Sequence, residues 1–321
     1  MKIGEQARKI VSTILLCVLV GAAGGITGTG TAAAATVSET TERVQYLLDH
    51  PVDGTVNLPQ GVFTIAPRLR LARGVKIVGH YTVLRVAPAS GDYLSVLTGT
   101  QPSTDLSGLS ITGVIFDQNA QENPVTTYSL YHGYPRFAVV AYKGTGITIR
   151  ANQFLNSDNL NTVVTGTVVT GAEITANIFK TVDAARHDHS SVYTNSTDVT
   201  ISGNSFYGTD VYGAAIETHG DRARITGNKV YGYYRGANIV SANTEFSNNA
   251  VFRGVNLADL WSLAPDGLHD VHVTDNRNYY PAPDYWQALI GVRIPAEYLR
   301  AVIYEPGAQL PFLRISVSGN Q

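Results

Sequence analysis

The sequence has 321 residues and a formal net charge of −2, and 15% of its residues are charged. A charge this close to zero excludes the strongly basic surface that nucleic-acid binding needs, so no nucleic acid is expected as a partner. The single cysteine excludes a disulfide framework. The chain is rich in glycine and tyrosine and poor in charge, which is typical of a secreted β protein with many tight turns.

Residues 1–35 have the features of a secretory leader. Basic residues precede an apolar run at 10–20, and the small residues at 32–35 suit signal peptidase. We predict a signal peptide at 1–35, a secreted protein, and no stable membrane insertion after cleavage. The alternative is a retained anchor, which is disfavoured because the apolar run is short for a bilayer span. Cys17 lies in the leader, so the mature chain would have no thiol.

The first element of the mature chain is predicted to be an amphipathic helix at residues 40–50. Val44 and Leu48 share one helix face, and Thr40 or Thr41 is available as the N-cap. A repeat fold must cover its open end, and this helix is suited to do so.

A short phrase recurs along the middle of the chain. It alternates apolar and polar residues, reaches a small residue followed by Asn, and then resumes with an apolar residue. Alternation predicts strands, and the small residue with Asn predicts a sharp turn. The phrase recurs at a period in the twenties, which indicates a solenoid. The marker asparagines are Asn152, Asn177, Asn204, Asn228, Asn249 and Asn276.

We therefore predict an all-β fold, a single-stranded right-handed parallel β-helix with an N-terminal capping helix and a C-terminal cap. Stacked coils would align the marker asparagines in a buried structural ladder. Residues 36–280 would form the β-helix, and residues 281–321 would form the cap of the same domain, because the repeat stops there. The alternating stretch at 312–317 is expected to pair with an edge strand of this chain or another.

Residues 54–86 carry a resemblance to a known family. A strand, the turn at Pro59-Gln60-Gly61 and a coil closed by Gly79 follow the first helix. In this pattern most of the mature chain resembles pectate-lyase-like right-handed β-helix proteins. That family includes uronate polysaccharide lyases, glycoside hydrolases, uronate epimerases and phage-type depolymerases. The resemblance therefore implies a β-helix with a polysaccharide as partner.

The subfamily stays unassigned, because its marker motifs are missing. The Asp-x-x-Asp calcium set of the pectate lyases and the motif set of the polygalacturonases are both absent. No cofactor and no metal site are expected. Calcium is an open alternative that no motif supports.

A second set of strands precedes the repeated phrase and carries the candidate site. In residues 215–219, Ile216 and Thr218 suit the interior, so Glu217 and His219 should point outward. Exposed strand positions usually carry Thr, Ser or Lys, so Glu217 and His219 indicate a functional patch. The alternative is an ordinary polar face.

Counting back from the repeated phrase places Tyr193, Glu217 and Asn238 in one column, which Asn256 is expected to extend. The predicted outer patch consists of Lys143, Tyr193, Asn195, Glu217, His219 and Asn238. Coil stacking would bring these side chains together at the inter-strand spacing of about 5 Å.

The turn at residues 180–190 is the densest ionisable cluster and should wall the patch. His187 and His189 flank Asp188, an arrangement that is a weak metal motif, a potential proton-transfer dyad, or a solvated loop. The long insertion at 117–137 carries tyrosines that could stack on sugars or pack on one another.

The residues divide into two groups by expected role. The catalytic candidates are Glu217, His219, Tyr193, His189 and Lys143. The substrate-binding candidates are Asn195, Asn238, Arg186, His187, Arg222 and Arg235.

β-Elimination on a uronate needs a group that neutralises the carboxylate, a base for the C5 proton and an acid for the leaving oxygen. Arg222, Asn195 or Asn238 could neutralise it. His219, His189 or Lys143 could be the base, and Tyr193 could be the acid.

Hydrolysis instead needs two carboxyls about 5–10 Å apart. The counting finds no second Asp or Glu in the column of Glu217, which favours a lyase or epimerase acting on a uronate-containing polysaccharide. The alternatives are a glycoside hydrolase, a non-catalytic solenoid that binds a glycan or cell surface, and, less favoured, a small-molecule cyclase or isomerase.

Overall fold

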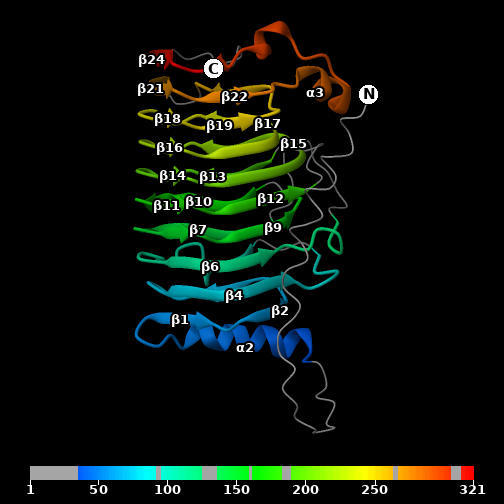
Figure 1. The fold of residues 1–321 in the computed structure, drawn as a ribbon. Helices are drawn as coiled ribbons and strands as arrows, with labels where there is room; N and C mark the ends of the chain where they lie inside the picture. Colours follow the sequence, from blue (N-terminus) through cyan, green and yellow to red (C-terminus); the bar gives the residue numbers. More distant parts are fainter. Residues whose placement is uncertain are drawn as a thin grey trace. The chain divides into compact units, whose positions relative to one another are not determined.

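The computed structural model describes residues 35–91, 95–124, 136–158, 161–182, 189–262, 267–304 and 312–321. The compact unit Thr36–Gln321 is a stack of coils, and its strands pair in parallel with strands of neighbouring coils (Figure 1). The predicted parallel β-helix is confirmed. Among the described residues, no helix is long and apolar enough to cross a membrane.

Each coil has three strand positions, which stack into three faces of the solenoid. The first face consists of β1 (Thr55–Leu58), the start of β4 (Lys76–Val86), the start of β6 (Ser110–Asp117), β8 (Thr148–Arg150), β11 (Glu173–Thr175), β14 (Thr200–Ser202), β16 (Arg224–Thr226), β18 (Glu245–Ser247), β21 (Leu268–Thr274) and β24 (Phe312–Ser318). This face carries the repeated phrase.

The second face follows the turn with the marker asparagine. It consists of β2 (Gly61–Ile65), the ends of β4 and β6, β9 (Gln153–Ser157), β12 (Ile178–Val182), the start of β15 (Ser205–Thr218), the start of β17 (Lys229–Ile239), β19 (Ala250–Phe252) and β22 (Arg277–Tyr279). The long strands β4, β6, β15 and β17 turn a corner and so belong to two faces.

The third face is the second set of strands that the sequence predicts. It consists of β3 (Leu69–Leu71), β5 (Ser95–Gly99), β7 (Phe137–Thr145), β10 (Asn161–Thr170), β13 (Ser190–Thr194), the ends of β15 and β17, β20 (Asn256–Leu260) and β23 (Val302–Tyr304). The candidate patch lies on its outer side.

Identical positions of successive coils fill the interior with the same kind of side chain. Phe154, Phe179 and Phe206 are fully buried, and their rings stack with centroids 4.8 and 4.7 Å apart. Stacking buries each ring between its neighbours, so the core is built from contacts between coils. The fold therefore needs several consecutive coils to be stable.

The marker asparagines form the predicted ladder. Asn204 Oδ1 accepts hydrogen bonds from the backbone N and Nδ2 of Asn177, and Asn204 Nδ2 donates to Asn228 Oδ1 and to Ile174 O. The residue before each Asn adopts a left-handed conformation, as Gly203 does with a φ of 62°. This turn is the physical reason for a small residue at that place.

The N-terminal helix α2 (Val37–Asp49) starts earlier than predicted. Its N-cap is Thr36, which forms a capping box with Glu39, and not Thr40 or Thr41. Val44 and Leu48 are buried against the first coil, so the helix covers the end of the solenoid as expected (Figure 1).

The C-terminal segment does more than cap. It contains β23 and β24, which pair in parallel with β20 and β21 and so add a further layer to the solenoid. Between β22 and β23 lies α3 (Pro283–Ile290), whose buried Trp286 packs with Tyr234 and Val255, followed by the 3₁₀ turn η1 (Ala296–Leu299).

Candidate functional site

One outward column on the third face carries the centre of the candidate site. Parallel pairing aligns Val164 with Tyr193, Tyr193 with Glu217, and Glu217 with Asn238. The core residues on either side of this column, such as Ile216 and Thr218, point inward and are buried. The structure thus brings Tyr193, Glu217 and Asn238 together on consecutive coils.

The Glu217 carboxylate is hydrogen-bonded to three side chains. Its Oε1 is 2.7 Å from His219 Nε2, and its Oε2 accepts from Ser190 Oγ at 2.8 Å and from Asn238 Nδ2 at 3.3 Å. The Glu217 side chain is 15% exposed and that of His219 is 25% exposed, so solvent and a ligand can reach both. Ser190 was not predicted from the sequence, because no motif marks it.

These contacts keep the Glu217 carboxylate ionised. Burial by itself raises the pKa of Glu217, but the hydrogen bond and charge of His219, with the hydrogen bonds of Ser190 and Asn238, outweigh it and hold the pKa below its ordinary value. Glu217 is therefore an anion at neutral pH and is suited to orient the imidazole of His219.

His219 is held between Glu217 and an aromatic ring. Its imidazole lies against Tyr193, with ring centroids 5.0 Å apart. Because Glu217 accepts from Nε2, the neutral imidazole carries its proton there and has a lone pair on Nδ1. Asn195 lies beside His219 on the preceding coil, because the backbone N of His219 donates a hydrogen bond to the backbone O of Thr194, the residue before Asn195. Gly220, the next residue, packs so closely against the preceding coil that a Cβ there would clash with Ser196 O.

The column continues differently from the prediction. Asn238 pairs with Asp259, whereas Asn256 pairs with Arg235 and lies in a neighbouring column. Asn256 therefore does not extend the column of Glu217, and a second carboxylate does share it. The inference that the column holds no further Asp or Glu is wrong.

Asp259 is nevertheless closed off from solvent. Its side chain is fully buried, its Oδ2 lies 2.5 Å from Arg235 Nη1, and its Oδ1 accepts from Asn256 Nδ2 at 2.6 Å. Arg235 also donates to Asn238 Oδ1 at 3.2 Å. Arg235 thus supports the site by holding Asn238 and neutralising Asp259.

His189 does not border the predicted outer patch. It is fully buried, and its Nε2 lies 3.0 Å from Ser191 Oγ and 3.3 Å from Thr181 Oγ1. The hydroxyl of Tyr233 joins the same network, and burial raises the pKa of Tyr233 to about 12, against the opposing effect of these hydrogen bonds. His189 is an interior polar residue, so its assignment as a surface catalytic group is wrong.

Two further candidates lie away from the centre. Arg222 forms a two-point ion pair with Asp198, at 2.6 and 2.9 Å, so its charge is already matched by a neighbouring coil. Lys143 is exposed on β7, and its charge is a minor contribution, after hydrogen bonds from Ser107, to the lowered pKa of Asp105. Neither is joined to Glu217 by a described contact.

Some predictions fall outside the described residues. Arg186 and His187 lie there, as do the tyrosines of the insertion at 117–137 and most of the leader. Within the described ranges, no group of three or more His, Cys, Asp and Glu side chains is arranged to hold a metal ion.

The ionisation of Glu217 predicts a pH dependence of stability. Its folded pKa lies below the ordinary value of 4.5, so its stabilising contribution is full above that pH and is lost as the pH falls through the folded pKa. The difference in melting temperature between the protein and Glu217→Gln is therefore expected to shrink in acid, and thermal unfolding across the acidic range measures it. A difference that grew on acidification would contradict the assignment. Glu173→Gln, on the first face, is the control.

Comparison with known proteins identifies the class of fold. No family model matches the sequence, and a search of curated proteins finds no match. Among solved structures, the chain is similar to the tailspike protein of E. coli bacteriophage HK620 in complex with a pentasaccharide, with a TM-score of 0.68 and 17% identity over 87% of this chain and 53% of the tailspike. A variant of the same tailspike in complex with a hexasaccharide gives 0.67 and 16% over 87% and 52%.

The similarity shows the fold. The chain spans about half the length of these tailspike chains. It is a right-handed parallel β-helix, as the sequence predicts.

Proposed function

We propose that this protein binds a polysaccharide along the outer side of the third face and transfers a proton at the Glu217–His219 pair. The observation that carries the proposal is the hydrogen bond between Glu217 and a partly exposed His219, set beside Tyr193 on a solenoid face. The oligosaccharides bound to the similar tailspike support a glycan as the ligand.

The arrangement suits base chemistry on a uronate, in the manner of the pectate-lyase-like proteins that the sequence resembles. His219 Nδ1 takes the C5 proton, and the Glu217 carboxylate stabilises the resulting imidazolium through Nε2. Tyr193, whose ring lies against that of His219, protonates the leaving oxygen in this proposal. Asn195 supplies the amide that hydrogen-bonds the substrate carboxylate in this proposal, because Arg222 and Arg235 already form ion pairs with Asp198 and Asp259. The same proton removal without loss of the leaving group gives epimerisation.

Hydrolysis is the second candidate, and one observation favours it. Asp259 lies two coils from Glu217, about 10 Å by strand spacing, which is close to the separation of the carboxyl pair in inverting glycosidases. One similar tailspike is a variant with an Asp and a Glu both replaced by Ala. Against hydrolysis, Asp259 is buried and ion-paired with Arg235. The lowered pKa of Glu217 also disfavours the protonated form that a general acid needs.

Incubation with a panel of uronate-containing and neutral polysaccharides tests the proposal. A rise in ultraviolet absorbance from unsaturated products is expected on a uronate polymer. Reducing ends without that absorbance would establish hydrolysis, and inversion of the sugar without chain cleavage would establish epimerisation. Binding without any product would establish a non-catalytic glycan-binding solenoid, and no binding to any polymer would contradict the proposal.

We further propose that residues 1–35 are a signal peptide and that the protein is secreted. The basic start, apolar run and small residues at 32–35 support this. N-terminal sequencing of the protein recovered from the culture medium is expected to begin at or near Thr36. An intact N-terminus on a membrane-bound protein would contradict it.

A further inference from the structure

The column of Glu217 begins at an arginine. Parallel pairing aligns Arg70 with Thr98, Thr98 with Val140, and Val140 with Val164, and the column then continues to Tyr193 and Glu217. Arg70 is therefore on the same outward side of the third face as the candidate site, at its N-terminal end.

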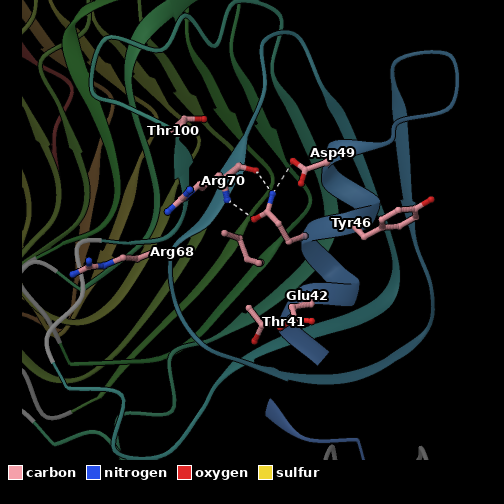
Figure 2. Close-up of a pocket in the computed structure, with 9 residues that line it drawn as sticks. Thr41, Glu42, Tyr46, Asp49, Arg68, Arg70 and Thr100 are labelled. Atoms are coloured by element: carbon pink, nitrogen blue, oxygen red, sulfur yellow. Dashed lines mark hydrogen bonds between the residues drawn. The ribbon is translucent and has the colours of Figure 1, made fainter. Parts of the chain in front are cut away.

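A cationic pocket lies at this end of the face. It has a volume of about 400 Å³ and is lined by Arg68, Arg70, Tyr142 and residues 98–102, and none of these described lining residues is acidic. Both arginines are exposed. In Figure 2 the side chains of Arg68 and Arg70 extend to the same side, away from α2.

The backbone beneath the pocket is fixed. Gln45 of α2 accepts a hydrogen bond from the backbone N of Arg70 and donates one to its O, at 2.9 and 3.0 Å (Figure 2). The side chain of Gln45 thus replaces a neighbouring strand at the edge of β3. Arg70 is therefore anchored at its backbone, with its guanidinium directed outward.

The arginines of this pocket differ from those near Glu217 in their charge partners. Arg222 and Arg235 form ion pairs with Asp198 and Asp259. Within the described part of the chain, neither Arg68 nor Arg70 has a carboxylate within ion-pair distance. A larger pocket of about 650 Å³ on the α2 side borders the same two arginines, but Glu42 and Asp49 line it as well (Figure 2). An anion is therefore favoured on the side of Tyr142.

A row of positions on successive coils joins the pocket to the centre of the site. Tyr142 lines the pocket, and Gly166, Asn195 and His219 follow it on successive coils. Tyr142, Asn195 and His219 are partly exposed, whereas Gly166 is buried between the coils. A Cβ on Gly166 would lie 2.9 Å from Tyr142 O, so the absence of a side chain lets the coils pack closely there. Three strand spacings separate Tyr142 from His219, about 14 Å, which a polysaccharide chain can span.

We propose that the Arg68–Arg70 pocket is a remote subsite that binds the carboxylate of an acidic sugar unit in the same polymer that reaches Glu217 and His219. This subsite rests on the proposed function, because it assumes that a polysaccharide lies along the third face. A guanidinium binds a carboxylate through two parallel hydrogen bonds, so the pair selects acidic polymers over neutral ones.

Binding measurements on paired polymers test the subsite. Polygalacturonate, alginate and hyaluronate serve as probes, each beside its carboxyl-reduced neutral form. At least one acidic polymer is expected to bind more tightly than its reduced form, and the double variant Arg68→Ala/Arg70→Ala should weaken that binding about tenfold or more. Binding of the reduced polymer should not change. Arg150→Ala, which removes an exposed arginine from the first face, is the matched control.

Three results would overturn the subsite. They are equal binding of every acidic polymer and its reduced form, unchanged binding by the double variant, and an equal loss in Arg150→Ala. Equal melting temperatures of the variants and the parent protein exclude unfolding. Loss of turnover in Glu217→Gln with unchanged binding in the double variant would reject the subsite and keep the proposed function. Unchanged turnover in Glu217→Gln, with weakened binding of the acidic polymer by the double variant, would keep the acidic-glycan subsite and reject the proposed chemistry.

Discussion

Replacing Asn204 with Leu is expected to lower the free energy of unfolding by about 3 kcal/mol or more. The side chain of Asn204 makes hydrogen bonds to Asn177, Ile174 and Asn228, all of them buried. Leucine has a similar branched shape but is larger and has no polar atom, so the backbone N of Asn177 and the backbone O of Ile174, both on the preceding coil, lose their partner. Each buried polar group left unpaired costs about 1–3 kcal/mol.

Chemical denaturation measures this loss, with Ser202→Leu as the control. Ser202 lies in the same phrase two residues earlier and is only partly buried. The control should therefore change stability little. Equal unfolding midpoints for Asn204→Leu and the parent protein would show that the ladder does not stabilise the solenoid.

The ladder was predictable because its signals are local. The alternation, the residue in the left-handed conformation and the Asn all fall within one short phrase, so each copy specifies its own turn. The last member, Asn320, was missed. It accepts from Asn276 across a separation of 44 residues, because α3 and the segments around it interrupt the spacing.

The outward column was predictable only in part, because counting assumes equal coils. Tyr193, Glu217 and Asn238 were placed correctly, since the turns between them are similar. Tyr193 precedes Ile201 by eight residues, and the same count back from Ile174 gives Gly166 as its partner. However, β10 has an irregular register between Thr165 and Val168, and Val164 takes that place. Asp259 was missed for a related reason. The sequence around Asn256 is similar to that around Asn238, but Asn256 lies one column away and Asp259 pairs with Asn238.

Burial at a strand start was not predictable from the sequence. His189 immediately precedes β13, where alternation does not yet fix the side-chain direction. Its inward orientation depends on the hydroxyls of Thr181, Ser191 and Tyr233, which come from three places in the chain. The same limit hid Ser190, which reaches Glu217 only because β13 and β15 pair in the observed register.

Glu217→Gln and His219→Ala are each expected to reduce turnover of the polysaccharide identified by the panel by at least about a hundredfold, the usual contribution of a general base. Gln keeps the shape and an acceptor for Ser190, but it removes the negative charge that stabilises the imidazolium of His219. Alanine at position 219 removes the base itself. Both side chains lie on the outer side of the solenoid, so the fold should persist.

Kinetics separate this role from a structural one. Loss of a base lowers kcat with little change in KM. Glu173→Gln, an exposed glutamate on the first face, should keep full activity. If both patch variants turned over substrate as fast as the parent protein, the reacting group would lie on another part of the chain, and the insertion at 117–137 would be the next segment to test.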